Sequence, residues 1–135
     1  MRAARNIPPY PAMKLQANPS SGQHIIAAHG PGWVEIDGRR YQRSLLITPA
    51  AIDANWGPDT CEALGEVHLG ALAVHTCDVL LLGTGSRQRF PQPQLLRSLI
   101  EAGIAVEIMD TAAACRTYNI VVAEGRAVVA ALVVE

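Results

Sequence analysis

Residues 79–109 read VLLLGTGSRQRFPQPQLLRSLIEAGIAVEIM, and this stretch decides the fold of the chain. Four consecutive apolar residues at 79–82 predict a strand buried on both faces. The stretch 93–101 starts with proline, carries its leucines and isoleucine on one face and is followed by Gly103, which predicts a helix. A second strand is expected at 104–109. Strand, helix and strand in this order predict a βαβ unit with parallel strands and a right-handed crossover.

Further elements are expected on both sides of this unit. Asp110 is a suitable N-cap for a helix that ends at Gly125. The apolar segment 126–134 predicts a last strand. Upstream, 62–75 carries an imperfect helical stripe weakened by two glycines, so we expect its helix mainly near 67–76.

The first third of the chain is expected to be β-structure. Asp37-Gly38 stands between two alternating runs, and this pair favours a type I′ hairpin turn, in which both central residues need a positive φ. The stretch 49–58 has the composition of a loop, in which Trp56 is expected to close one end of the core. Strands are predicted at 25–27, 33–36, 39–41 and 44–48.

Together these elements predict one layered α/β domain at 23–135, in which an N-terminal antiparallel portion leads into a mixed sheet covered by helices. Residues 1–22 include a proline-rich stretch that cannot be helical, and we interpret them as a flexible arm. Met13 is an alternative to Met1 as the start of translation. The mass of the native protein would distinguish the two.

The composition excludes several classes of protein. The 135 residues are 50% hydrophobic and 17% charged, with a formal net charge of -1. A chain of this size can hold one core without cross-links, and its balanced charge speaks against nucleic acid as a partner, because that binding needs a basic surface. The apolar runs are far shorter than the ~20 residues of a membrane-spanning helix. An odd number of scattered cysteines does not predict a disulfide framework.

The sequence resembles a known family over about 25–134. The segments LLLGTGSRQRFP, MDTAAACRTYN and EGRAVVAAL occur in the order and spacing of the domain family that includes the mitochondrial respiratory complex I assembly factor 3. The resemblance implies a three-layer β plus α/β fold. For the mitochondrial branch it implies a role in assembling a membrane-bound NADH dehydrogenase, with subunits of the respiratory complex as partners. By the same resemblance, the protein is expected in the cytoplasm if it is bacterial and in mitochondria if it is eukaryotic.

A candidate site is expected where the parallel strands end, because ligands of open α/β folds bind at that edge of the sheet. On the helix that follows, Arg116 and Asn119 share a face, which we expect to point toward the turn after the first strand. An arginine fork, a helix N-terminus and glycine amides favour a small anion or carboxylate. Alternatively, Arg116 binds loop carbonyls or pairs with Asp110. The predicted site residues are Gly83, Thr84, Gly85, Asp110, Arg116 and Asn119.

Cys115 suggests a catalytic nucleophile, because a thiol early in a helix can have a lowered pKa. The alternative is a small apolar residue buried among alanines, and we favour it. His75 is the one candidate base that the sequence offers, and its distance from the thiol is open. Cys115 is therefore the one residue to which the sequence assigns a possible catalytic role.

The remaining polar residues predict neither a cofactor nor a metal. Gly83-x-Gly85 lacks the third glycine of a dinucleotide-binding motif. Histidines and cysteines at 61–77 lack the close paired spacing of a zinc site. Arg87 and Arg89 are expected to form an exposed basic loop that is either solvated or faces an acidic partner. Asp37, Asp53 and Asp59 are assigned to turns, without a carboxylate pair for acid–base chemistry.

Two functions fit these observations. The first is a non-enzymatic interaction or assembly module, favoured by the resemblance and by the lack of a complete catalytic constellation. The second is a small anion- or carboxylate-binding protein or enzyme with its site at Arg116, Asn119 and the Gly83–Gly85 turn. A module should expose an apolar or charged patch of at least a few hundred Å², roughly, whereas an enzyme should have a concave polar pocket beside Arg116. A mean hydropathy of +0.17 also favours a homodimer.

Overall fold

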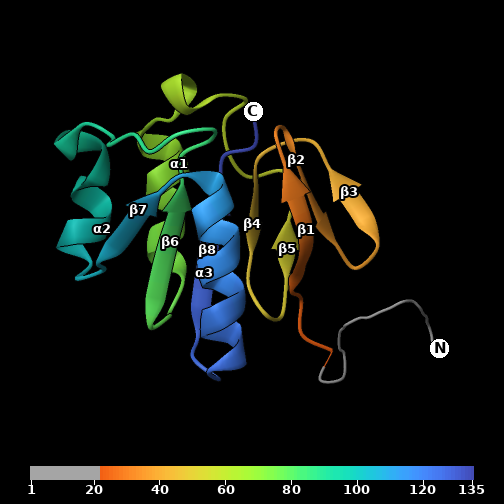
Figure 1. Cartoon of the computed structure of the whole chain (residues 1–135). Coiled ribbons are helices and arrows are strands. Elements are labelled where there is room, and N and C mark those ends of the chain that lie inside the picture. The colour runs from red at the N-terminus through yellow and green to blue at the C-terminus, as the bar shows by residue number, and fades with distance from the viewer. Residues whose placement is uncertain (1–21) are drawn as a thin grey trace.

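The structure, a computed structural model, describes residues 22–135, so the predicted arm up to residue 21 and the alternative start at Met13 lie outside the described residues. A mixed sheet of five strands forms the middle layer (Figure 1). Its strands are β4 (Leu45–Ile47), β5 (Ile52–Asp53), β6 (Val79–Gly83), β7 (Val106–Met109) and β8 (Val128–Leu132). The strand order is β5-β4-β8-β6-β7, with β6 parallel to both of its neighbours and β4 antiparallel to both of its own.

The predicted βαβ unit is confirmed by the parallel pairing of β6 with β7. The helical crossover between them begins as a 3₁₀ turn at Pro93–Leu96 and continues as α2 (Arg97–Glu101). Gly103 has a φ of 75°, and the N–H of Ile104 donates to the carbonyl of Leu99 at 2.8 Å. Ile104 thus belongs to the C-terminal cap of the helix, and β7 starts at Val106, two residues after the predicted start at 104.

A second, antiparallel sheet comes from the N-terminal part of the described chain. Its strands are β1 (Ile26–Gly30), β2 (Trp33–Ile36) and β3 (Arg39–Tyr41), in that order. Asp37 and Gly38 have φ values of 55° and 79°, which confirms the predicted type I′ turn between β2 and β3. The register of β1 against β2 shifts between Ile26 and Ala28, as in a β-bulge.

The longest described helix, α3 (Thr111–Ala123), has 13 residues and follows β7 directly. Asp110 is its N-cap, as predicted, because its side chain accepts a hydrogen bond of 2.8 Å from the N–H of Ala113. Gly125, with a φ of 75°, ends the helix. None of the helices within 22–135 has both the length and the apolar composition needed to cross a membrane.

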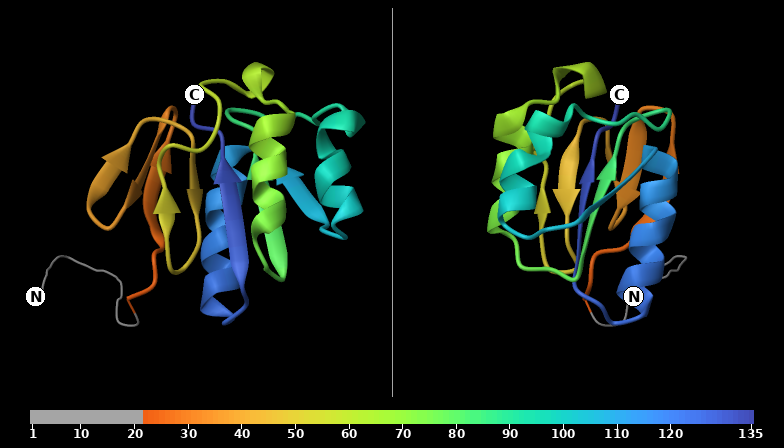
Figure 2. Two further views of the ribbon diagram at one scale, coloured as in Figure 1. Left: turned by 180° about the vertical axis from the view of Figure 1, so that it is seen from behind. Right: turned by 90° about the vertical axis from the view of Figure 1, so that its left-hand side faces the viewer.

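Two hydrophobic cores lie on the two faces of the five-stranded sheet, which gives three layers (Figure 2). Successive side chains of β6 point to opposite faces of the sheet, so Leu81 faces one core and Leu80 and Leu82 face the other. The first core is closed by α3 and the three-stranded sheet. The second is closed by α2 and α1 (Glu66–Gly70). The expected three-layer β plus α/β arrangement is therefore observed.

Two local predictions were inaccurate. The helix predicted within 62–75 is broken into a 3₁₀ turn at Cys61–Ala63, α1 and a second 3₁₀ turn at Ala71–Val74. The break occurs because Gly65 is fully extended just before α1. The predicted loop 49–58 contains β5, a strand of two residues that pairs with β4. Trp56 is buried in the second core, and its indole N–H donates to the carbonyl of His68 at 2.9 Å.

Candidate functional site

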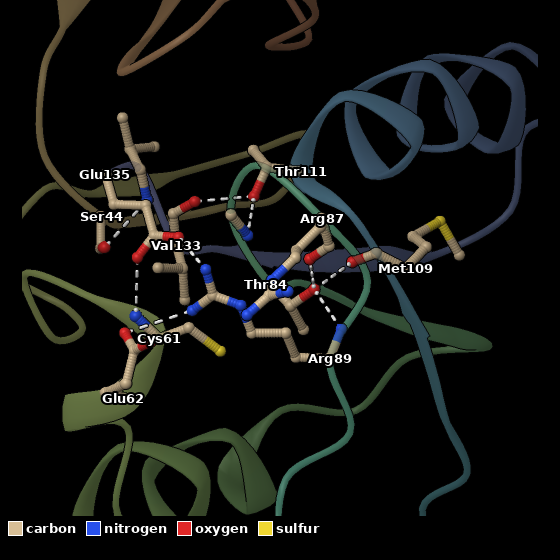
Figure 3. A network of polar contacts seen from close by, with 12 residues as sticks. Ser44, Cys61, Glu62, Thr84, Arg87, Arg89, Met109, Thr111, Val133 and Glu135 are labelled. Carbon is tan, nitrogen blue, oxygen red and sulfur yellow. Dashed lines mark hydrogen bonds and ion pairs between the residues drawn. The ribbon is translucent and has the colours of Figure 1, made fainter.

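The Gly83-Thr84-Gly85 turn lies against the first turn of α3, as its place at the end of β6 predicts (Figure 3). The N–H of Thr84 donates to the carbonyl of Met109 at 2.9 Å. The N–H of Gly85 donates to Oγ1 of Thr111 at 2.8 Å, and the N–H of Thr111 donates back to the carbonyl of Gly85 at 2.9 Å. The structure thus brings the turn and the N-terminus of α3 together.

The side chain of Thr84 is fully buried at the centre of this turn. Its Oγ1 accepts a hydrogen bond of 3.1 Å from the N–H of Arg89 and has the carbonyls of Arg87 and Met109 at 2.7 and 3.2 Å as acceptors. The hydroxyl of Thr111 donates to the carbonyl of Val133 at 2.7 Å. Protein atoms therefore satisfy the polar groups of both threonines.

Two glycines allow this close packing. A Cβ on Gly83 would lie 3.0 Å from the Cα of Thr111, and Gly85 has a φ of 95°, which side chains rarely adopt. Because the amides of Thr84 and Gly85 already donate to protein oxygens, they are not free to cradle an anion. We interpret the turn as a structural joint between β6 and α3.

Arg89 turns inward, in contrast to the exposed loop expected for Arg87 and Arg89. Arg87 is exposed, but the side chain of Arg89 is 23% exposed and lies between two carboxylates (Figure 3). Its Nη2 is 3.0 Å from Oε2 of Glu135, and its Nη1 is 3.2 Å from Oε1 of Glu62. The predicted exposure was therefore wrong for Arg89. The sequence pattern could not show this, because both of its partners are distant in the sequence.

Cys61 completes the cluster of Cys61, Glu62, Arg89 and Glu135. Its main-chain N–H donates to Oε1 of Glu135 at 2.9 Å, so one carboxylate contacts two segments of the chain. Burial raises the pKa of the Cys61 thiol, although the nearby guanidinium of Arg89 acts in the opposite direction. The thiol therefore lacks the lowered pKa of a reactive cysteine.

Cys115 is fully buried in the core between α3 and the sheets. Burial raises the pKa of its thiol to about 12, although Arg116 acts to lower it. Such a shift is opposite to the one that a nucleophile needs. His75 follows the 3₁₀ turn on the other side of the five-stranded sheet, so it is not placed to act as a base. These observations favour the apolar interpretation of Cys115.

Asn119 contacts β1 instead of the Gly83–Gly85 turn. Its Nδ2 donates to the carbonyl of Ile26 at 2.8 Å, and its Oδ1 accepts from the N–H of Ile26 at 2.9 Å. Tyr118, the residue before Asn119, donates from its hydroxyl to the carbonyl of His24 at 2.7 Å. The polar face of α3 thus attaches the helix to the three-stranded sheet, a contact that the sequence pattern did not reveal.

Arg116 is exposed on the same side of α3, beside an open groove of about 360 Å³. Within residues 22–135 it forms no hydrogen bond and no ion pair, so it neither binds loop carbonyls nor pairs with Asp110. The structure therefore separates Arg116 and Asn119 from the other four predicted site residues. The groove is lined by Ile26, Ala27, Ala28, His29, Cys115, Arg116 and Asn119.

The described residues do not form a candidate metal site, because no three histidine, cysteine or acidic side chains of 22–135 gather in one place. Cys61 and Cys77 are partly exposed and Cys115 is buried, and none of the three is in a disulfide.

Comparison with known proteins identifies the family. A family described as "Protein of unknown function (DUF498/DUF598)" matches residues 26–133, which include both sheets and all the helices described above. The chain belongs to this family. The resemblance that the sequence suggested over about 25–134 is thereby confirmed, together with its α/β fold.

Relatives of the chain include NADH dehydrogenase (ubiquinone) 1 alpha subcomplex assembly factor 3 from several animals. The assembly factor of Bos taurus is 45% identical over 88% of this chain and 65% of its own length. That of Danio rerio is 32% identical over 88% of this chain and 68% of its own length. The chain thus spans about two thirds of these relatives. The protein in a crystal structure from Bordetella parapertussis is 36% identical to this chain, and the match covers 87% of this chain and all of that protein's chain, with a TM-score of 0.78.

Proposed function

We propose that this DUF498/DUF598 protein is a non-enzymatic interaction module that takes part in the assembly of a membrane-bound NADH dehydrogenase. The likeness to assembly factors over 88% of the chain carries this proposal, because a match of that length includes most of the folded domain. The burial of Cys115 and the internal use of the turn amides also support a role without catalysis at the predicted site. We expect the protein in the cytoplasm of a bacterium or in the mitochondria of a eukaryote.

We further propose that the outer surface of the α1–α2 layer contacts the partner. Large apolar side chains are strongly exposed there, at 78% for Val67, 81% for Val74 and 66% for Ile100. These residues lie on helical segments that pack against one another. Phe90, in the segment leading to the same layer, is 72% exposed. Exposed apolar groups concentrated on one layer are typical of protein–protein contact surfaces.

Purification of the tagged protein from its own cells in mild detergent tests both parts of the proposal. We expect mass spectrometry to find NADH dehydrogenase subunits or an assembly intermediate with the protein. Val74→Glu and Ile100→Glu should remove these partners, because each change places a charge in the proposed contact. Ile120→Glu is the matched control, since Ile120 is 59% exposed but lies on α3, on the opposite face of the sheet.

Two outcomes would contradict the proposal. Recovery of the protein without NADH dehydrogenase subunits would contradict the assembly role. Equal loss of partners with Ile120→Glu would contradict the assignment of the contact to the α1–α2 layer. The same surface would also suit a second copy of the chain. Sedimentation velocity distinguishes this possibility, because it measures whether the protein is a monomer or a dimer. A dimer that Val74→Glu dissociates would assign the surface to self-association.

A further inference from the structure

The groove beside Arg116 is bounded by the edge of a sheet and by a helix. β1 is an edge strand, with β2 on one side and α3 along the other (Figures 1 and 2). Asn119 occupies this edge at Ile26, where its amide bonds both main-chain groups as a neighbouring strand would. The remainder of the edge, from Ala27 to His29, lines the groove.

The main chain of His29 offers a free donor and a free acceptor at this edge. Gly30 is paired with Trp33 across a two-residue turn, so the main chains of these two residues are hydrogen-bonded to each other. Hydrogen-bonded and non-hydrogen-bonded pairs alternate along antiparallel strands, so the next pair, His29 with Val34, is not hydrogen-bonded. The N–H and C=O of His29 therefore point away from β2, as those of Ile26 do. No other element described within 22–135 bonds these two groups.

The charge of the groove is positive. Arg116 projects beside it without an ion pair among the described residues, and no aspartate or glutamate is part of the lining. Cys115, the other ionisable α3 residue of the lining, is a neutral thiol at physiological pH. The guanidinium is a planar fork of donors that matches a carboxylate in two parallel hydrogen bonds.

We propose that this groove binds an extended acidic peptide segment, whose main chain pairs with the free edge of β1 at His29 and whose carboxylate is bound by Arg116. Addition of a strand to a sheet edge supplies the main-chain bonds, and the arginine supplies the preference for an acidic residue. Residues 1–21 of this chain contain no aspartate or glutamate, so they do not supply the carboxylate, and we assign the acidic segment to another protein. The proposal is independent of the assembly role, because it concerns the opposite face of the five-stranded sheet from the α1–α2 layer.

The test is an NMR titration of the isotope-labelled full chain with two pools of capped hexapeptides. The pools have random β-branched flanks and differ in one central residue, which is glutamate in one pool and glutamine in the other. We expect the glutamate pool to shift the amide signal of His29 and the Nε–H signal of Arg116. It should bind at least about tenfold more tightly than the glutamine pool, because a charge-assisted bond is lost in the latter.

Variants of exposed arginines assign the effect to the groove. Arg116→Gln should abolish the difference between the pools, and Arg116→Lys should reduce it, because lysine lacks the planar fork. Arg97→Gln is the matched control, since Arg97 is exposed on α2 and should leave the difference unchanged. Equal binding of the two pools, or a difference that survives Arg116→Gln, would overturn the proposal. Equal shifts at both reporter groups with sodium acetate would also overturn it, since a free carboxylate would then suffice.

Discussion

Arg89 and Glu135 are 46 positions apart in the sequence, yet Nη2 of Arg89 lies 3.0 Å from Oε2 of Glu135. The same carboxylate accepts the main-chain N–H of Cys61. It therefore joins the segment after β6, the segment after β8 and the 3₁₀ turn before α1. Because both side chains are mostly shielded from solvent, salt should screen this pair less than a surface pair.

Glu135→Gln is expected to lower the stability of the fold. The amide keeps the size of the side chain and can still accept a bond from Cys61, but it no longer neutralises the guanidinium of Arg89. Urea unfolding of Glu135→Gln, Arg89→Met and the double variant measures the coupling between the two residues. We expect the double variant to lose less free energy of unfolding than the two single variants lose together. Strictly additive losses would show that the ion pair does not hold the segments together.

Gly85→Ala is expected to destabilise the protein by about 1–3 kcal/mol, because an alanine would be forced to a strained backbone conformation. The φ of Gly85 is 95°, and a Cβ there would overlap the carboxylate of Glu135. Gly38→Ala is the matched control, because Gly38 has a φ of 79° but nothing within 4 Å of a Cβ. Both changes strain the backbone, and Gly85→Ala also displaces the partner of Arg89. If thermal unfolding gave equal losses for both variants, the contact with Glu135 would have no role.

Asn119→Leu should cost about 1–3 kcal/mol for each main-chain group that it leaves without a partner. The change removes both hydrogen bonds that attach α3 to Ile26. Urea unfolding measures the loss, and amide hydrogen exchange at Ile26 should become faster in the variant. Arg116→Ala, three residues earlier on the same helix, should change stability by less than about 0.5 kcal/mol, since its side chain is exposed. Unchanged exchange at Ile26 would contradict a structural role for Asn119.

The sequence predicted the elements whose signals are local. The strand Val79–Gly83 is marked by an apolar run, and α2 is marked by a glycine shortly after its end. Asp110 caps α3 through a contact only three residues away. Such patterns are visible without knowledge of the fold. The two-residue strand β5 has no pattern of its own, because it is defined by its pairing with β4.

The candidate site was harder to predict, because it depends on which layer each face of α3 meets. The sequence indicated that Arg116 and Asn119 share a face, but it did not indicate that β1, more than 80 positions earlier, packs against that face. Proximity to the Gly83–Gly85 turn was the simpler hypothesis. Similarly, the inward position of Arg89 requires Glu62 and Glu135, whose proximity arises from the tertiary structure alone.

The buried thiol of Cys115 predicts a loss of stability at alkaline pH. Burial raises its pKa from 9.0 to about 12 in the folded protein, so above pH 9 the unfolded chain loses this proton and the folded chain keeps it. The stabilisation is fully present below pH 9 and is lost as the pH rises toward 12. The total change is about 4 kcal/mol for a difference of three pKa units. Burial also raises the pKa of Tyr118, which adds a loss of the same sign.

Urea unfolding between pH 8 and pH 10.5 measures this loss, and Cys115→Ala identifies its source. The variant should lose some packing energy at every pH, but its stability should fall less steeply with pH than that of the parent protein, because one of the titrating groups is gone. Cys77→Ala is the control, since the Cys77 thiol is partly exposed and a smaller change in slope is expected. A thiol reagent should modify Cys115 after unfolding. Rapid modification in the folded protein, or an unchanged slope in Cys115→Ala, would contradict a neutral buried thiol and restore Cys115 as a candidate nucleophile.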